Sequence, residues 1–183
     1  MNFKIEEWNE RASRWPEFIA CLTEVAPDQL PFVLGEQYRA HRSYLFVALC
    51  SGEVMGLLRF AVQPIGPEAK CPTLHIGDAA LCEAKIHAFA VREEARGRGI
   101  GTALQKRAIM RARELGCHQV ASYSSYGRDA NHRVKLALGF GAQPEVHGDK
   151  HQGVYFILPL QADAVLSRPA AAPTRRIEHE RTT

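Results

Sequence analysis

Several features that would assign a chain to a membrane or to secretion are absent from this sequence. No apolar run approaches the roughly 20 residues that a bilayer-spanning helix requires. Residues 1–10 carry Lys4, Glu6, Glu7 and Glu10, so they contain no apolar core of a signal peptide. We therefore expect no membrane partner and a cytoplasmic location.

Cysteines are few, and their spacing argues against two kinds of site. The chain has five, at Cys21, Cys50, Cys71, Cys82 and Cys117, without a Cys-x-x-Cys pair. This usage suits reduced thiols in the cytosol better than a disulfide framework. A series of Cys71, His75, Cys82 and His87 has a spacing that matches no standard zinc finger or ribbon, so we expect no metal.

The charge distribution lacks the clustered basicity of a nucleic-acid-binding protein. Lysine and arginine number 23 against 20 acidic residues, a formal net charge of +3. Basic residues do gather on one segment, at Lys106, Arg107, Arg111 and Arg113, but no aromatic stacking pattern accompanies them. We interpret that segment as a solvated helix face and expect no nucleic-acid partner.

The residues that are present predict one α/β domain. The chain has 183 residues, of which 46% are hydrophobic, which is enough for a single core. Residues 162–183 have almost no bulky apolar side chains, so we expect a domain at 1–161 and a disordered tail. Hydrophobic periodicity predicts strands at 2–6, 44–49, 54–62, 83–91, 119–124 and 154–158, and helices at 10–23, 32–39, 131–138 and before Gly116.

One turn between a predicted strand and a predicted helix carries the chemistry. It reads Arg96-Gly97-Arg98-Gly99-Ile100-Gly101-Thr102. Glycines allow positive φ and close approach of the backbone, and a helix N-terminus adds about half a positive charge. Two arginines supply charge-assisted bonds that suit a pyrophosphate. The turn therefore indicates an anion site.

Two other phosphate-binding motifs do not fit this turn. A P-loop needs Lys-Ser or Lys-Thr after its last glycine, whereas Gly101 is followed by Thr102 and Ala103. A dinucleotide fingerprint needs a GxGxxG spacing, whereas this turn reads GxGxG. An ordinary glycine-rich turn with two solvated arginines is the alternative to an anion site.

Two landmarks together resemble the GCN5-related N-acetyltransferases (GNAT). The first is Arg96-x-x-Gly99-x-Gly101, preceded by His87-Ala88-Phe89-Ala90-Val91 and followed by an amphipathic helix. It is similar to the acetyl-CoA-binding motif of that family. The second is the segment from Asn131 to Phe140, with its Leu-Gly-Phe ending. The resemblance covers residues 43–160.

The resemblance implies a mixed, splayed central sheet flanked by helices, with the pantetheine arm of acetyl-CoA in the gap between two strands. It further implies that Phe89, Ala90 and Val91 offer main-chain groups to the pantetheine and that Asn131 lies beside it. The pyrophosphate would be held by the turn, at Arg96, Gly97, Arg98, Gly99, Ile100, Gly101 and Thr102. The implied activity is acetyl transfer to a primary amine of a small molecule or protein, with a non-catalytic acyl-CoA-binding or sensing module as the alternative. The oligomeric state stays open, a homodimer included.

The strand before the turn supplies candidate bases. Strict alternation places Glu83, Lys85, His87, Phe89 and Val91 on one face, which we expect to line the cleft. Lys85 occupies the commonest position of the family's glutamate base. We therefore favour His87 as base or water relay, because an ordinary histidine pKa of about 6.5 suits proton exchange, with Glu83 as second choice. A purely structural histidine is an equal alternative.

The general acid is less clearly indicated. Many members of the family place a tyrosine four residues before the glycine of the Gly-Phe pair, and that position is Lys135 here. Tyr126 or Tyr123 could substitute, although a tyrosine on a strand is more often structural. His132 beside the second landmark is a further candidate, with a plain helix-surface role as an equal alternative. The thiolate could also leave unassisted, since a thiol is a much better leaving group than an amine.

Overall fold

The computed structural model describes residues 2–35, 42–147 and 151–160, so the tail predicted at 162–183 lies outside the described residues. The strands are β1 (Phe3–Trp8), β2 (Arg42–Cys50), β3 (Glu53–Pro64), β4 (His75–Ile76), β5 (Ala79–Ala80), β6 (Cys82–Val91), β7 (Gln119–Ser125), β8 (Gly141–His147) and β9 (His151–Pro159). The α-helices are α1 (Trp15–Val25), α2 (Leu30–Leu34), α4 (Ile100–Glu114) and α5 (Asp129–Ala137). Short 3₁₀ turns are η1 (Pro27–Gln29), η2 (Pro67–Ala69) and η3 (Glu93–Ala95).

The main sheet has seven strands in the order β1-β2-β3-β6-β7-β9-β8. Neighbouring strands run antiparallel except β6 and β7, which pair in parallel. Such a parallel pair needs a crossover connection, and α4 provides it. The mixed sheet confirms the predicted fold class.

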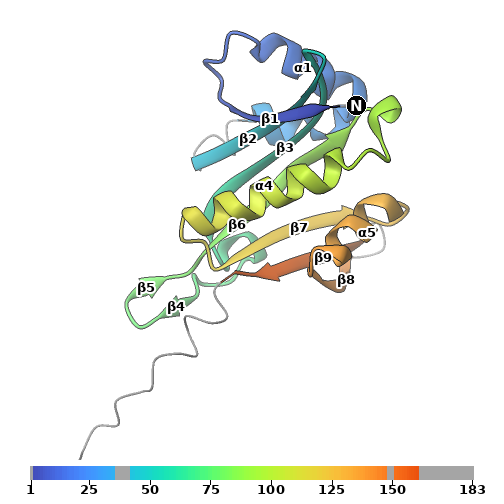
Figure 1. Cartoon of the computed structure of the whole chain (residues 1–183). Coiled ribbons are helices and arrows are strands. Elements are labelled where there is room, and N and C mark those ends of the chain that lie inside the picture. Colours follow the sequence, from blue (N-terminus) through green and yellow to red (C-terminus); the bar gives the residue numbers. More distant parts are fainter. Residues whose placement is uncertain (1, 36–41, 148–150, 161–183) are drawn as a thin grey trace, which may run out of the picture.

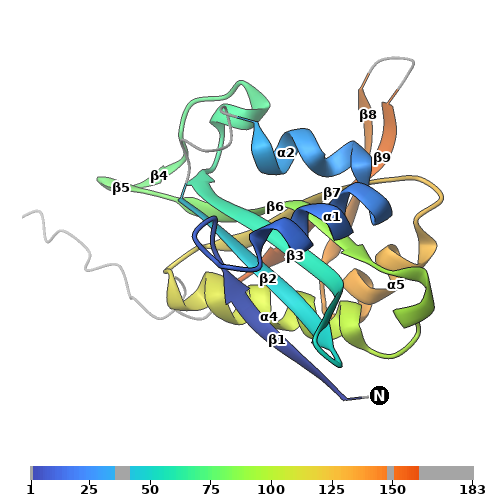
Figure 2. The ribbon, with the colours of Figure 1, turned by 90° about the horizontal axis from the view of Figure 1, so that it is seen from above.

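Helices cover both faces of the sheet (Figures 1 and 2). On one face, Phe18 and Leu22 of α1 pack with Val47 of β2 and Leu57 of β3. On the opposite face, Ile100, Leu104 and Ala108 of α4 pack with other residues of the same strands, such as Phe46 and Leu58. Because neighbouring residues of a strand point to opposite faces and both faces are covered, the centres of β2 and β3 are largely apolar, with the buried Arg59 of β3 as an exception.

The predicted elements differ from the structure mainly near the two ends. The first helix begins at Trp15 rather than near residue 10, with Pro16 in its first turn, where a missing N–H costs no hydrogen bond. The second helix is Leu30–Leu34, and residues 36–39 of the predicted one lie outside the described part. Strand β8 was not predicted, because Gln143, Pro144 and Glu145 interrupt any apolar pattern. Proline is tolerated there because β8 lies at the sheet edge.

A β-bulge in β6 corrects the predicted alternation along this strand. Phe60 of β3 lies opposite Ile86, but the preceding Arg59 lies opposite Ala88, so His87 is an extra residue in β6. Before the bulge, Ala84 and Ile86 pack on the α4 face; after it, Phe89 and Val91 do so. Ala88 and Ala90 pack on the α1 face. Phe89 and Val91 therefore do not share a face with Glu83 and Lys85.

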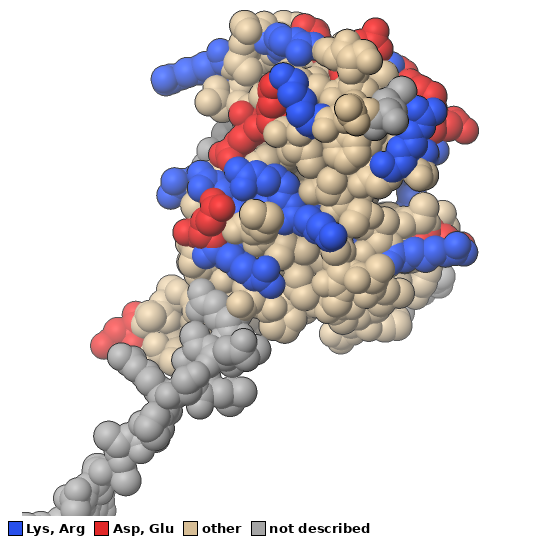
Figure 3. All heavy atoms as spheres, viewed as in Figure 1, with Lys and Arg blue, Asp and Glu red and all other residues tan. Residues whose placement is uncertain are grey.

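The basic residues of α4 lie among acidic ones (Figure 3). Arg111 pairs with Glu114 at 2.9 Å and lies 3.6 Å from Glu7 of β1, and Arg107 lies within 4 Å of the same two carboxylates. This pairing supports the interpretation of a solvated, charge-balanced face. Among the described helices, none combines the length and the apolar character that crossing a lipid bilayer would need.

Candidate active site

The central strands β6 and β7 pair along only part of their length. Their register runs from Glu83 opposite Gln119 to Ile86 opposite Ser122, while β6 continues to Val91 and β7 to Ser125. Beyond these four pairs the strands part, and a cavity of about 1630 Å³ opens between and around them. That volume exceeds the range of about 300–1,000 Å³ typical of small-ligand pockets. The cavity suits a long ligand.

The glycine-rich turn forms one end of this cavity. Gly97 and Gly99 have φ of 72° and 82°, a region that glycine enters without steric cost. Gly99 is the N-cap of α4, and no side chain caps the first turn of that helix. Gly99, Ile100, Gly101 and Thr102 all line the cavity. Uncapped N–H groups at the positive end of a helix dipole make an anion site.

The other residues of the turn occupy different environments. Nε of Arg96 donates a hydrogen bond to the Val91 carbonyl at 3.1 Å, which ties the turn to the end of β6. Arg96 and Gly97 line the cavity, but Arg98 does not. A Cβ at Gly101 would lie 3.2 Å from the Phe89 ring. A larger side chain at Gly101 would therefore need the Phe89 ring to shift by a few tenths of an ångström where α4 packs on β6.

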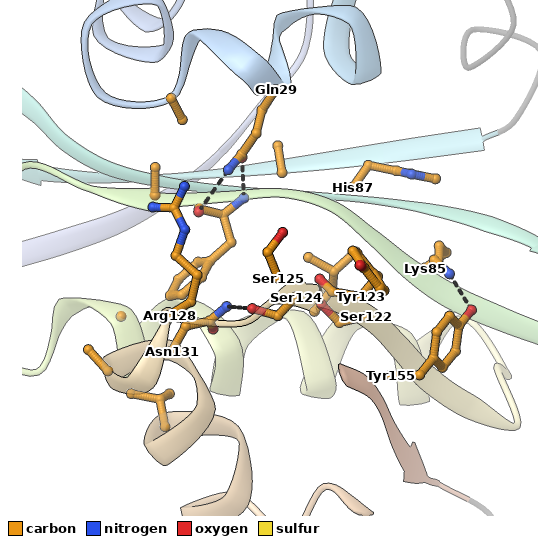
Figure 4. A pocket seen from close by; sticks show the side chains of 18 of the residues that line it. Gln29, Lys85, His87, Ser122, Tyr123, Ser124, Ser125, Arg128, Asn131 and Tyr155 are labelled. Carbon is orange, nitrogen blue, oxygen red and sulfur yellow. Dashed lines mark hydrogen bonds between the residues drawn. The ribbon is translucent and has the colours of Figure 1, made fainter. Parts of the chain in front are cut away.

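The side chain of Gln29, in η1, hydrogen-bonds to the main chain of Phe89 (Figure 4). The Phe89 N–H donates to Oε1 of Gln29 at 2.8 Å, and Nε2 of Gln29 donates to the Phe89 carbonyl at 3.5 Å. The Phe89 peptide groups therefore face the gap rather than β3. Sequence reasoning did not single out Gln29, because it is sixty residues away from Phe89 and belongs to no motif.

A polar cluster joins β7 to α5 at the cavity wall. Asn131 Nδ2 donates to Ser124 Oγ at 3.1 Å, and His132 Nε2 lies 3.1 Å from the same oxygen. Asn131 and Ser124 line the cavity, together with Arg128 of the preceding turn. These bonds hold Asn131 at the cavity wall.

Glu83 is fixed by two amide side chains. Its carboxylate accepts hydrogen bonds from Gln63 at 3.1 Å and from Gln119 at 2.7 Å, and the residue is only 5% exposed. Gln63 also donates to Glu68 at 2.7 Å. These bonds satisfy the Glu83 carboxylate and fix its orientation. They favour a structural role for Glu83, although it lines the cavity.

Lys85, at the position where a glutamate base was expected, has partners that keep it charged. Its Nζ donates to Oη of Tyr155, lies 4.1 Å from the centre of that ring, and pairs with Glu68 at 3.0 Å. Burial opposes the charge, but the bond with Tyr155 and the field of Glu68 outweigh it, so the Lys85 pKa lies above its ordinary value. A charged ammonium cannot accept a proton. Lys85 therefore does not replace the glutamate base.

Lys135 has a very different environment from that of Lys85. It is 1% exposed, its Nζ donates to Ser122 Oγ at 2.8 Å, and it lies 4.7 Å from the centre of the Phe156 ring. Burial, together with the positive charge of Lys85, lowers its pKa from 10.5 to about 7. The sequence showed Lys135 only as a departure from the family's tyrosine. Its burial became visible only in the fold.

The candidate catalytic side chains are divided by the structure. His87, on the bulge, lines the cavity. In the view of Figure 4, His87 and Gln29 lie on one side of β6, and the serines of β7 lie on the other side. Tyr126 is 50% exposed and lies outside the cavity lining. Tyr123 does line it, and its ring packs over Gly153, where a Cβ would lie within 3 Å of the ring. Tyr123 therefore fits the cavity better than Tyr126.

Tyr155 and Glu68 also line the cavity, and sequence reasoning missed both. Tyr155 lies directly across from Tyr123 in the β7–β9 pair, so both rings stand on one face of the sheet. Glu68 comes from η2, between the strands predicted at 54–62 and 83–91, where no element was predicted. A period-two pattern in β9 could have indicated Tyr155, but no local signal pointed to Glu68.

Known proteins are similar to this chain in sequence or in fold. A family model described as "Acetyltransferase (GNAT) family" matches residues 4–140. Among solved structures, Arabidopsis thaliana NAA60 in complex with acetyl-CoA aligns with a TM-score of 0.67 at 14% identity, covering 87% of this chain and 99% of that one. The ribosomal-protein-S18-alanine N-acetyltransferase of Escherichia coli aligns with a TM-score of 0.60 at 15% identity, covering 87% and 94%. The sequence matches no curated protein.

Proposed function

The chain belongs to the acetyltransferase (GNAT) family, and on that premise we propose that it transfers the acetyl group of acetyl-CoA to a primary amine. The acceptor is a small molecule or a protein, and it attacks the thioester directly while both substrates are bound. The observation that carries this proposal is the parting of β6 and β7 after Ile86 and Ser122, directly beside the uncapped N-terminus of α4.

The residues present fit acetyl-CoA at this site. The uncapped N–H groups at the start of α4 suit the pyrophosphate, and Gly97 and Gly99 let the backbone approach it. The gap beside Phe89 suits the pantetheine arm, because its amides can pair with main-chain groups as a neighbouring strand would. Acetyl-CoA, when bound, supplies an acetyl group activated as a thioester.

Side chains and main-chain groups of this chain then act on the acceptor amine. An amine with an ordinary pKa near 10 is protonated at pH 7, so it must lose a proton before it can attack. His87 lies on the cavity wall at the bulge, and we assign it as base or water relay. Main-chain N–H groups near Val91 would stabilise the developing oxyanion. Tyr123 and Tyr155 provide a wall against which the acceptor packs.

Thiol release from acetyl-CoA tests the proposal directly. The protein would be given a panel of amines, namely polyamines, free amino acids and peptides with a free N-terminus, and acetylated products would be identified by mass. We expect release with at least one class of acceptor. Tight acetyl-CoA binding without turnover on any amine would replace the proposal by the sensing module, and absence of binding would refute both.

A further inference from the structure

We propose that Lys135, acting through the hydroxyl of Ser122, delivers the proton that the departing thiolate of coenzyme A requires. This inference rests on the proposed function, and it assigns a role to the side chain that departs from the family's tyrosine. Ser122 is the last β7 residue paired with β6, so its side chain stands where the two strands part. It also lines the cavity.

The geometry provides a short path from a buried cation to that cavity. Nζ of Lys135 donates to Ser122 Oγ at 2.8 Å, a good distance for proton transfer along a hydrogen bond. Lys135 is 1% exposed and Ser122 is 2% exposed. Bulk water therefore reaches Lys135 poorly, and the cavity side of Ser122 is the route by which its proton can reach a bound ligand.

The surroundings make the Lys135 ammonium acidic enough to give up its proton. The Phe156 ring of β9 lies against the Lys135 ammonium, and His132, which belongs to α5 like Lys135, packs on the same ring. Lys85 of β6 adds a positive charge nearby. Burial and Lys85 together lower the Lys135 pKa to about 7. A thiol has an ordinary pKa near 8.5, so the transfer from ammonium to thiolate is favourable.

A structural role explains this lysine poorly. A buried cation costs free energy unless its partners are excellent, and Lys135 contacts one neutral hydroxyl and one aromatic ring. A leucine or methionine would fill the same space between α5 and the sheet without that cost. A residue that weakens the fold in this way is expected where function requires it.

The proton balance of the step is closed. The amine nitrogen bonds to the acetyl carbon, the carbon–sulfur bond breaks, and its electron pair stays on sulfur. Ser122 passes its hydroxyl proton to that sulfur and takes one from Lys135, which becomes neutral. The proton that the amine loses leaves through His87 or water, and Lys135 regains a proton from water entering the emptied cavity. No oxidant or reductant is needed.

The experiment compares Lys135→Met, Ser122→Ala and, as a matched control, Lys106→Met, an exposed lysine of α4. The readouts are acetyl-CoA affinity, turnover against pH, and an NMR titration of the lysine ammonium groups in protein free of acetyl-CoA. We expect Lys135 to titrate near pH 7. Lys135→Met and Ser122→Ala should each lower kcat about 10²-fold with acetyl-CoA affinity within about threefold of wild type.

Further outcomes separate this inference from the proposed function. Wild-type kcat should fall as pH rises through about 7, because the acid form of Lys135 is lost, and Lys135→Met should lack that fall. A Lys135 that titrates near 10, or two active-site variants with wild-type kcat, would overturn the relay while leaving acetyl transfer intact. If Lys135→Met does not fold, Ser122→Ala and the titration still decide. A wild-type protein without turnover would instead refute the proposed function.

Discussion

The main-chain N–H of Phe89 and the side-chain oxygen of Gln29 form a 2.8 Å hydrogen bond across the mouth of the gap between β6 and β7. The second bond, from Gln29 to the Phe89 carbonyl, makes the side-chain amide imitate a neighbouring strand. Gln29 thus satisfies backbone groups at which β6 would otherwise face an open gap. A ligand that pairs with the same groups has to displace it.

Removing Gln29 should therefore strengthen acetyl-CoA binding. The 2.8 Å bond alone contributes about 0.5–1.5 kcal/mol, so we expect Gln29→Ala to bind about two- to tenfold more tightly by calorimetry. Asp28→Ala, which changes the neighbouring cavity residue but leaves these bonds, is the control. Weaker binding by Gln29→Ala would show that Gln29 contacts the ligand instead of competing with it.

The turn at the start of α4 permits a test with a matched backbone. Gly99 and Gly52 have nearly the same φ, 82° and 89°, and a Cβ at either would meet nothing within 4 Å. Glutamate should strain both positions by about 1–3 kcal/mol. Only Gly99→Glu sets a carboxylate at the anion site, so its acetyl-CoA affinity should fall at least tenfold. Gly52→Glu, in the β2–β3 turn, should bind as wild type; equal losses would refute the anion site.

The proposed base can be tested against its carboxylate competitor. His87→Ala should lower turnover about 10²-fold while acetyl-CoA affinity is nearly unchanged, because the side chain lies outside the glycine turn. The rise of the rate with pH that a neutral imidazole requires should disappear. Glu83→Gln should have a smaller effect on turnover, since Gln63 and Gln119 already hold its carboxylate. The reverse order of the two effects would assign the base to Glu83.

Lys135 should also make stability depend on pH. Its pKa is about 7 in the folded protein, against 10.5 for an ordinary lysine. Below pH 7 the lysine is therefore charged in both the folded and the unfolded protein, and burial of this charge lowers the free energy of unfolding by its full amount. As pH rises from 7 to about 10.5, the unfolded chain binds the extra proton and stability should rise. Lys135→Met should add roughly 1–4 kcal/mol to the free energy of unfolding at pH 6.

Denaturant titrations at pH 6 and pH 9 would measure this effect. The gain from Lys135→Met should be smaller at pH 9 than at pH 6, and Lys106→Met should change little at either pH. A gain that does not vary with pH would mean that Lys135 stays charged in the folded protein throughout this range.

Periodic and glycine-marked segments were the parts of the fold that could be predicted well. The core strands β2, β3 and β6, the helix α4 and the turn from Arg96 to Thr102 all follow from local signals. Strand β8 did not, because Pro144 and its polar neighbours carry no apolar pattern at a sheet edge. The face of Phe89 was predicted wrongly, because one extra residue at His87 reverses every later side chain and leaves no local trace.

The site was predictable only where its residues share a motif. Gly99 and Asn131 were predicted from their landmarks, and both line the cavity. Gln29, Glu68 and Tyr155 reach it from three distant parts of the chain, and their contacts with Phe89 and Lys85 depend on tertiary packing. No pattern within a single segment reports such contacts.

The short parallel register between β6 and β7 has a mechanical consequence. It joins two antiparallel sections, β1-β2-β3-β6 and β7-β9-β8, through four residue pairs, whereas β6 and β3 share nine. A molecule bound in the gap contacts both sections at a place where β6 and β7 do not pair with each other, so it adds contacts between the two sections. Occupancy should therefore couple the two sections, and amides of β7 and β9 should exchange with solvent more slowly when acetyl-CoA is bound.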